Sequence, residues 1–220
     1  GIDSDKKTKK LTSKEIDKVG GGQADALFLL VVNTKTEKMN LISINRNTKT
    51  AVDIYDSDGK LYNTEDLQIC LAHAYGDGMK SSCENQTTAV SNLFYELPIN
   101  GYIAVNKGAI RTINNAIGGV TLTTLEDLPF GSKAIRKAGN TVTLSDEDAY
   151  AYTSKRDTSS FDSATRRMER QKQYITEYMK LVKLKIKANP AFIMDLYNSI
   201  KDYTVTDINA QELSYLATTV

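Results

Sequence analysis

The sequence is poor in the residues that most often build catalytic and metal sites. It has one histidine, His73, which excludes a site of two or three histidine ligands and leaves one candidate base for a Ser-His-Asp or Cys-His arrangement. Its two cysteines, Cys70 and Cys83, are too few for a cysteine-rich zinc site, although they allow one disulfide in an oxidising compartment. The longest apolar run, residues 26–32, is far shorter than the roughly 20 residues of a transmembrane helix. Any chemistry must therefore rest on other groups.

The charges nearly cancel, because 28 Lys+Arg face 27 Asp+Glu and leave a formal net charge of +1. No basic helix-turn-helix is apparent either, so a DNA-binding role is disfavoured and we expect no nucleic-acid partner. Arginine, however, is concentrated: four of the seven arginines lie between Arg156 and Arg170. Because arginine suits bidentate contact with oxyanions, this cluster indicates an anion site, and a salt-bridged helix face is the alternative.

The order of hydrophobic patterns predicts alternating strands and helices in this chain of 220 residues. Residues 4–23 lack hydrophobic periodicity and are typical of a long loop. Ser145 is positioned as the N-cap of a helix with acidic residues in its first turn. The expected strands are 24–33, 39–47, 101–106 and 120–124, and the expected helices include 64–75, 84–97 and a long one over 163–188. This alternation favours one α/β domain with a mixed sheet.

The long helix carries Arg167, Arg170 and Gln171 at positions i, i+3 and i+4, so the three side chains share one helix face. Two guanidiniums and an amide near a helix N-terminus suit a pyrophosphate or a sugar phosphate. Arg156, shortly before the helix, is a candidate to close the same pocket, and a local ion pair with Asp157 is the alternative.

A series of short motifs occurs in a fixed order over residues 3–175. The motifs are GID, GGGQAD, LISINRNT, LAHAYGDG, INGYIAVN, INNAIGGV and finally YTSKRD with FDSATRRMERQ. This ordered set resembles the LytR-CpsA-Psr family of bacterial cell-wall enzymes. The resemblance implies a phosphotransferase that moves an anionic wall glycopolymer, such as a teichoic acid or a capsular polysaccharide, to peptidoglycan. The donor in this family is an undecaprenyl-pyrophosphate-linked glycan, with Mg2+ or Mn2+ at the pyrophosphate.

The resemblance also assigns roles to individual residues. Asp3 and Asp25 match the two carboxylates that hold the metal, and oxygen ligands suit such an ion. Arg46, Arg156, Arg167, Arg170 and Gln171 match the residues that bind the pyrophosphate. Within this set, Asp25, Arg46 and Arg167 are the expected catalytic residues. Asp25 or a metal-bound hydroxide is the candidate base for the acceptor hydroxyl.

Three features depart from the family pattern. The turn that normally reads Arg-Asp-Thr contains Asn47 in place of the aspartate, and an arginine of a second motif is replaced by Ser154. Asp25 is flanked by Ala24 and Ala26, where the family more often has serine and threonine. These departures leave two alternatives open. One is a non-catalytic module that binds polyprenyl-pyrophosphate lipids or wall polymer, and the other is a lipid pyrophosphatase.

The family implies one domain over residues 1–220, with helices on both faces of a central mixed β-sheet. It further implies that the sequence is cut at both ends, with an N-terminal membrane anchor and a first strand missing, and that the domain works at the extracytoplasmic face of the membrane. In that compartment we expect a disulfide between Cys70 and Cys83. A prenyl tail needs an apolar groove, and its candidate lining residues are Phe28, Leu30, Leu41 and Ile103. Ordinary core packing is the favoured explanation for each of them, because buried strands have the same composition.

Overall fold

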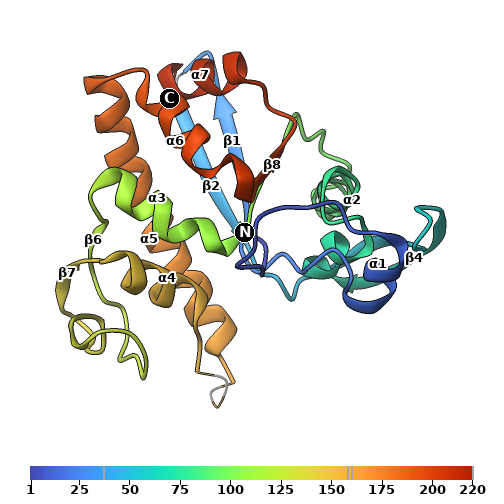
Figure 1. Ribbon diagram of the computed structural model, residues 1–220, viewed down its shortest axis with the longest axis horizontal. Helices are drawn as coiled ribbons and strands as arrows, with labels where there is room; N and C mark the ends of the chain where they lie inside the picture. Colours follow the sequence, from blue (N-terminus) through green and yellow to red (C-terminus); the bar gives the residue numbers. More distant parts are fainter. Residues whose placement is uncertain (37, 158, 160, 220) are drawn as a thin grey trace. The chain divides into compact units, whose positions relative to one another are not determined.

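Helices and strands alternate along the chain in a computed structural model, which describes residues 1–36, 38–157, 159 and 161–219 (Figure 1). The α-helices are α1 (Ser13–Val19), α2 (Lys80–Leu93), α3 (Ile110–Ile117), α4 (Asp146–Ser154), α5 (Ser163–Ala188), α6 (Phe192–Ile200) and α7 (Ala210–Thr219). The strands are β1 (Leu27–Asn33), β2 (Lys38–Ile44), β3 (Lys49–Tyr55), β4 (Leu61–Gln68), β5 (Ile103–Val105), β6 (Thr121–Thr123), β7 (Thr141–Thr143) and β8 (Thr204–Thr206). Short 3-10 helices are η1 (Ile69–Tyr75), η2 (Lys107–Ala109), η3 (Lys133–Ile135) and η4 (Lys201–Tyr203). The predicted α/β class is confirmed.

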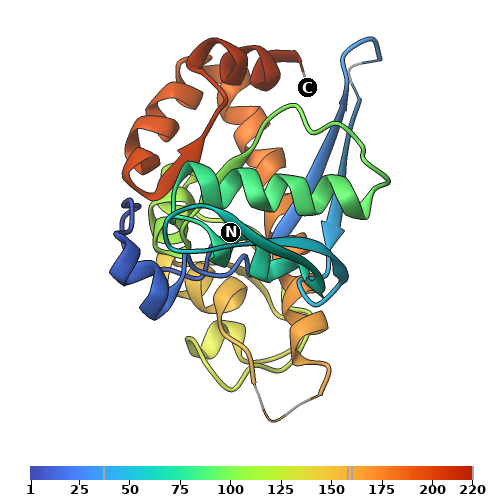
Figure 2. The ribbon, with the colours of Figure 1, turned by 90° about the vertical axis from the view of Figure 1, so that its right-hand side faces the viewer.

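The described strands pair two by two. β1 pairs with β2, and both views show these strands running side by side (Figures 1 and 2). β3 pairs antiparallel with β4, β5 with β8, and β6 with β7. Isolated bridges join Ile2 antiparallel to Ala24 and parallel to Asn106, so the pairing is mixed.

The contacts divide the chain into two compact units whose segments interleave in the sequence. The first unit comprises residues 1–30, 44–106 and 201–209, and the second comprises 31–43, 107–200 and 210–220. Neither unit is one continuous stretch, because the chain passes from one to the other several times. The organisation of the whole chain as one domain stays a prediction.

Each unit has a hydrophobic core of its own. In the first, α2 and η1 pack against β3, and the buried side chains are those of Ile44, Val52, Ile69, Ala72 and Ala89. In the second, α3 and α4 pack against the long helix α5, as Figure 1 shows. Its buried core residues include Leu122, Ile135, Leu144, Tyr152, Tyr174 and Tyr178.

The prediction of a helix over 64–75 is wrong in its first half. Residues 61–68 form β4, which pairs with β3 across a turn at Asp56, whose Oδ1 accepts hydrogen bonds from the backbone N–H groups of Asp58 at 3.1 Å and Lys60 at 2.8 Å. β4 is exposed at nearly every position and Leu67 is its half-buried residue. A strand without a buried face has no alternating hydrophobic pattern. The helical spacing of the apolar residues in η1 therefore led to a helix being predicted over the end of β4 as well.

The helix signals that depend on local capping are confirmed. Ser145 is the N-cap of α4, and its hydroxyl accepts a hydrogen bond from the backbone N–H of Asp148 at 3.1 Å. The long helix α5 covers the predicted residues. The predicted loop over 4–23, in contrast, contains α1, which begins after a capping box formed by Thr12 and Glu15.

No helix in the described part of the chain is long and apolar enough to span a membrane.

Candidate functional site

The two carboxylates expected to hold a metal flank one β-bridge in the first unit. Ile2 and Ala24 form this antiparallel bridge and are buried, while the backbone N–H of Asp3 donates to Gln23 O at 2.9 Å and that of Asp25 donates to Gly1 O at 2.9 Å. Side chains alternate between the two faces of paired extended segments, so Asp3, Gln23 and Asp25 lie on the face opposite Ile2 and Ala24. Diagonal neighbours of this kind are about 7–8 Å apart at Cα, which lets both carboxylates approach one ligand.

Arg46, just after β2, contacts this face. One terminal nitrogen forms an ion pair with Asp25 Oδ1, and the other donates to Gln23 Oε1 and lies 3.3 Å from Cys70 Sγ. The Arg46 and Asp25 side chains are only 17% and 15% exposed. The guanidinium is therefore oriented by several neighbours in a partly dry environment, where its charge acts more strongly than at an open surface.

The residues of this face fit a hard divalent cation of the magnesium kind. Mg2+ keeps several of its waters and commonly takes only one or two carboxylates from a protein. Asp3 and Asp25 supply two, and among the described residues no group of three or more His, Cys, Asp or Glu forms a fuller ligand cage. Arg46 forms an ion pair with Asp25, so its guanidinium would lie beside the same carboxylate as the divalent cation.

In the second unit, the predicted anion-binding face of α5 meets the end of α4. Arg167 and Arg170 are only 5% and 2% exposed. Gln171 Nε2 donates to Thr153 O at 2.9 Å, and Arg167 Nη1 donates to Ser154 O at 3.5 Å. Arg170 donates to Tyr152 O and, through Nη2, to Lys155 O at 2.7 Å.

These contacts satisfy carbonyls that a helix leaves without intrahelical partners in its last turn, and they place positive charge at the negative end of the α4 dipole. Burial lowers the pKa of the Arg170 guanidinium, and the nearby Glu126 carboxylate opposes that shift. Arg167, Arg170 and Gln171 thus share one face as predicted, and each of them donates a hydrogen bond to a backbone carbonyl at the end of α4.

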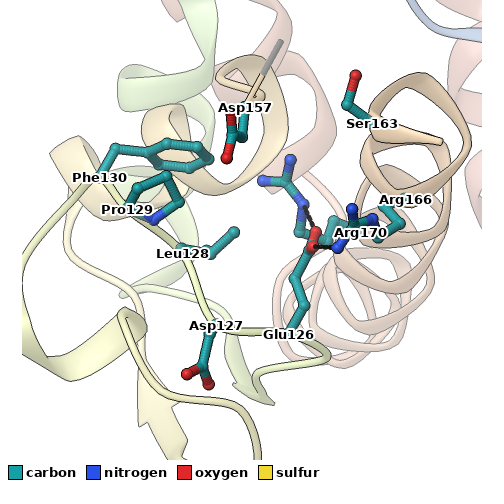
Figure 3. Close-up of a pocket in the computed structure, with 9 residues that line it drawn as sticks. All are labelled: Glu126, Asp127, Leu128, Pro129, Phe130, Asp157, Ser163, Arg166 and Arg170. Atoms are coloured by element: carbon teal, nitrogen blue, oxygen red, sulfur yellow. Dashed lines mark hydrogen bonds and ion pairs between the residues drawn. The ribbon is translucent and has the colours of Figure 1, made fainter. Parts of the chain in front are cut away.

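A small pocket lies beside these arginines (Figure 3). Glu126 lies between two guanidiniums: its Oε1 is 2.9 Å from Arg170 Nε and its Oε2 is 3.2 Å from Arg166 Nη1. The ring of Phe130 forms another wall, with its centroid 5.5 Å from the Arg170 guanidinium carbon. The lining residues are Glu126, Asp127, Leu128, Pro129, Phe130, Asp157, Ser163, Arg166 and Arg170.

Arg156 is exposed in the segment that follows α4. The alternative of a local ion pair with Asp157 gains no support, because Asp157 Oδ1 accepts hydrogen bonds from Ser159 through its backbone N–H at 3.0 Å and its hydroxyl at 2.6 Å. Those hydrogen bonds lower the pKa of Asp157. Arg156 is thus the most accessible arginine of the predicted set in this unit.

The predicted site residues therefore form two groups. Asp25 and Arg46 are in direct contact in the first unit, with Asp3 on the same face, whereas Arg156, Arg167, Arg170 and Gln171 belong to the second unit. Sequence reasoning missed Gln23 and Glu126. Gln23 had a usable signal, since it lies two residues before Asp25 in an extended segment. Glu126 had none, because its partners Arg166 and Arg170 are distant in sequence.

The candidate lipid-groove residues differ in exposure. Leu27 and Leu29 pack on the core of the first unit, so the alternating positions Phe28 and Leu30 point away from it. Leu30 and Ile103 are exposed, and Phe28 and Leu41 are half-buried. Ordinary core packing therefore does not explain the exposed pair, and the groove itself stays a prediction.

The predicted disulfide between Cys70 and Cys83 is wrong, because both are buried free thiols. Cys70 contacts Arg46, whereas Cys83 Sγ lies 3.9 Å from His73 Nε2. The glycine-containing segment between the two cysteines leaves the thiols on different partners, with Cys70 in η1 and Cys83 in α2. Burial raises the pKa of the Cys83 thiol to about 12.

His73 is a packed, hydrogen-bonded residue. It is 2% exposed, and its Nδ1 lies 2.9 Å from Gly22 O. Because a carbonyl oxygen only accepts, Nδ1 carries the proton and Nε2 faces the Cys83 thiol. Burial lowers the pKa of His73.

Solved bacterial proteins share this α/β fold. Bacillus subtilis TagV matches with a TM-score of 0.68 at 22% identity, covering 90% of this chain and 71% of that one. Protein gbs0355 from Streptococcus agalactiae matches with a TM-score of 0.71 at 20% identity, covering 90% and 67%. The LytR-Csp2A-Psr enzyme from Actinomyces oris matches with a TM-score of 0.64 at 15% identity, covering 91% and 72%.

The model of the LytR_cpsA_psr family matches residues 1–220. The chain therefore belongs to the LytR-CpsA-Psr family. A curated relative, the polyisoprenyl-teichoic acid–peptidoglycan teichoic acid transferase TagU of Bacillus cereus (strain AH820), is 30% identical over 132 residues, which are 60% of this chain and 38% of that protein. The chain thus spans well under half the length of this relative.

Proposed function

We propose that this chain is the catalytic part of a phosphotransferase that moves an anionic wall glycopolymer from a polyprenyl-pyrophosphate carrier to peptidoglycan. The single observation that carries the proposal is the Arg46 guanidinium held on the Asp25 carboxylate, in a chain that belongs to the LytR-CpsA-Psr family. The relatives named TagU act on teichoic acid and peptidoglycan according to their names, which supports the same kinds of substrate here.

The site suits a reaction that depends on charge neutralisation. A hydroxyl oxygen of the acceptor attacks the phosphorus that carries the glycan, a new P–O bond forms, and the bond to the lipid-side phosphate breaks. The lipid monophosphate leaves, and the hydroxyl proton passes to a base, for which Asp25 is the candidate. Arg46 binds the phosphoryl oxygens and stabilises the charge that grows on them in the transition state.

Asp3 and Asp25 would hold a Mg2+ or Mn2+ ion on the face that they share with Gln23. The ion supplies neutralisation of the pyrophosphate charge. Arg46 orients the Asp25 carboxylate through their ion pair, and the partly buried position of the pair limits the access of water to that carboxylate. We propose that this chemistry takes place at the extracytoplasmic face of the membrane.

Transfer can be tested directly with a lipid-pyrophosphate-linked glycan, peptidoglycan and Mg2+. The proposal predicts a glycan covalently attached to peptidoglycan, together with lipid monophosphate, and loss of both products on Asp25→Asn. Release of lipid monophosphate with no attached glycan would assign a lipid pyrophosphatase instead. Tight donor binding without either product would assign a binding module, the alternative that Asn47 and Ser154 raise.

A further inference from the structure

Glu126 forms ion pairs with two arginines of α5. It lies shortly after β6, and its carboxylate joins Arg166 and Arg170 on α5 through contacts of 3.2 and 2.9 Å. Figure 3 shows the carboxylate between the two guanidiniums, whereas the neighbouring Asp127 points away from them. Asp127 instead accepts from the backbone N–H of Ala138 at 2.9 Å and pairs with Lys137 at 3.1 Å.

Arg170 connects Glu126 to the end of α4. Its Nε faces Glu126, and its two terminal nitrogens donate to the carbonyl oxygens of Tyr152 and Lys155. The guanidinium is planar and rigid, so fixing Nε also fixes the direction of the other two nitrogens. Arg170 is 2% exposed, and its guanidinium is held by Glu126 and by these two carbonyl oxygens.

Lys155 is the residue immediately before the exposed Arg156. The bond from Arg170 Nη2 to Lys155 O, 2.7 Å long, therefore fixes the backbone at the point where the segment carrying Arg156 leaves α4. Arg156 has no fixing contact of this kind among the hydrogen bonds and ion pairs of the described residues. Its placement depends on this anchored backbone.

We propose that Glu126 is a positioning residue that places Arg156 for its anionic substrate, acting through Arg170 and Lys155. The proposal rests on the proposed function in taking a pyrophosphate as the ligand of Arg156. Removing the Glu126 charge leaves Arg170 buried without its counter-charge, which loosens the anchored carbonyl. In a Glu126 variant the Arg156 side chain then samples more orientations. Ordering that side chain on an anion therefore costs more conformational entropy.

A double-mutant cycle tests this chain of contacts. The measured quantity is the Kd of farnesyl pyrophosphate in the presence of Mg2+, obtained by calorimetry for the wild type, Glu126→Gln, Arg156→Ala and the double variant. We expect Glu126→Gln to weaken binding about tenfold in the wild-type background and less than about twofold in the Arg156→Ala background. Asp127→Asn removes the carboxylate of the adjacent residue and is the matched control. We expect it to leave the Kd unchanged.

Equal losses in both backgrounds would overturn the proposal, because Glu126 would then act independently of Arg156. Tighter binding by Glu126→Gln would also overturn it, since Glu126 would then simply repel the ligand. Glu126→Asp, which keeps the charge on a shorter side chain, should recover part of the lost affinity.

Hydrogen exchange gives a readout that needs no ligand. The backbone N–H groups of Arg156 and Asp157 should exchange severalfold faster in Glu126→Gln than in the wild type, and at the wild-type rate in Asp127→Asn. If the wild type fails to bind farnesyl pyrophosphate, the proposed function fails while this comparison still decides the positioning role. Unchanged exchange in Glu126→Gln would contradict it.

Discussion

Asp25 and Arg46 form an ion pair in which both side chains are less than one-fifth exposed. Arg46 follows β2 and Asp25 precedes β1, and both residues belong to the first unit. Gln23 and Cys70 contact the same guanidinium and restrict it further. An arginine held in this way is oriented before any ligand arrives, which lowers the entropy cost of binding.

Asp25→Asn should destabilise the protein as well as abolish transfer. The amide keeps the size of the side chain but removes the charge that balances Arg46, so we expect the free energy of unfolding to fall by about 1–3 kcal/mol. Urea denaturation measures this change. Asp66→Asn, on the exposed strand β4, is the control and should change stability by less than about 0.5 kcal/mol. Equal effects of the two variants would refute the structural role of the pair.

The two thiols should be present and protected. Native protein should react with an aromatic disulfide reagent at neither Cys70 nor Cys83, because both are buried and the pKa of Cys83 is raised to about 12. Unfolding in denaturant without a reductant should then release two thiols per chain. Fewer than two thiols before reduction would show that a disulfide forms.

Buried His73 should make the protein less stable in mild acid. Burial lowers its pKa in the folded state, so the unfolded chain binds the proton more readily. Its contribution to stability is complete above about pH 6.5 and is lost as the pH falls from there towards the lower folded-state pKa. His73→Asn preserves a donor for Gly22 O and does not titrate. Its unfolding free energy should fall less between pH 7 and pH 5 than that of the wild type, and parallel curves would contradict this assignment.

Asn114 in α3 should be a strong stability determinant of the second unit. It is 1% exposed, and its amide donates to Leu144 O and Asp146 Oδ1, both at 3.0 Å. Its Oδ1 accepts from the backbone N–H of Val120 at 3.2 Å and from the Tyr174 hydroxyl at 3.3 Å. Asn114→Ala leaves these buried groups without partners and should cost about 2–4 kcal/mol in urea denaturation.

The neighbouring Asn115 gives the matched control for that variant. It is exposed on the same helix, so Asn115→Ala should change the free energy of unfolding by less than about 0.5 kcal/mol. A loss for Asn114→Ala no larger than this would show that the Asn114 network contributes nothing.

Local signals in the sequence predicted what local physics controls. The Ser145 cap and the periodicity of α5 depend on residues within a few positions of one another, and both were predicted correctly. The β3–β4 hairpin was missed because β4 buries almost nothing. Periodicity placed Arg167 and Arg170 on one face of α5 but did not reveal what that face meets, which is the end of α4. The contacts of Glu126 depend on the tertiary fold, and no sequence pattern near residue 126 predicts them.

The proposed function depends most on Arg46, which would bind the pyrophosphate. The most direct test is the Kd of farnesyl pyrophosphate, with farnesol as the uncharged comparison, for the wild type and Arg46→Ala. The account predicts that the wild type prefers the pyrophosphate by at least about 100-fold and that Arg46→Ala loses about tenfold or more of that preference, since one charged contact contributes about 1.4 kcal/mol or more. Equal affinity of the wild type for the two lipids, or an unchanged Kd in Arg46→Ala, would contradict it.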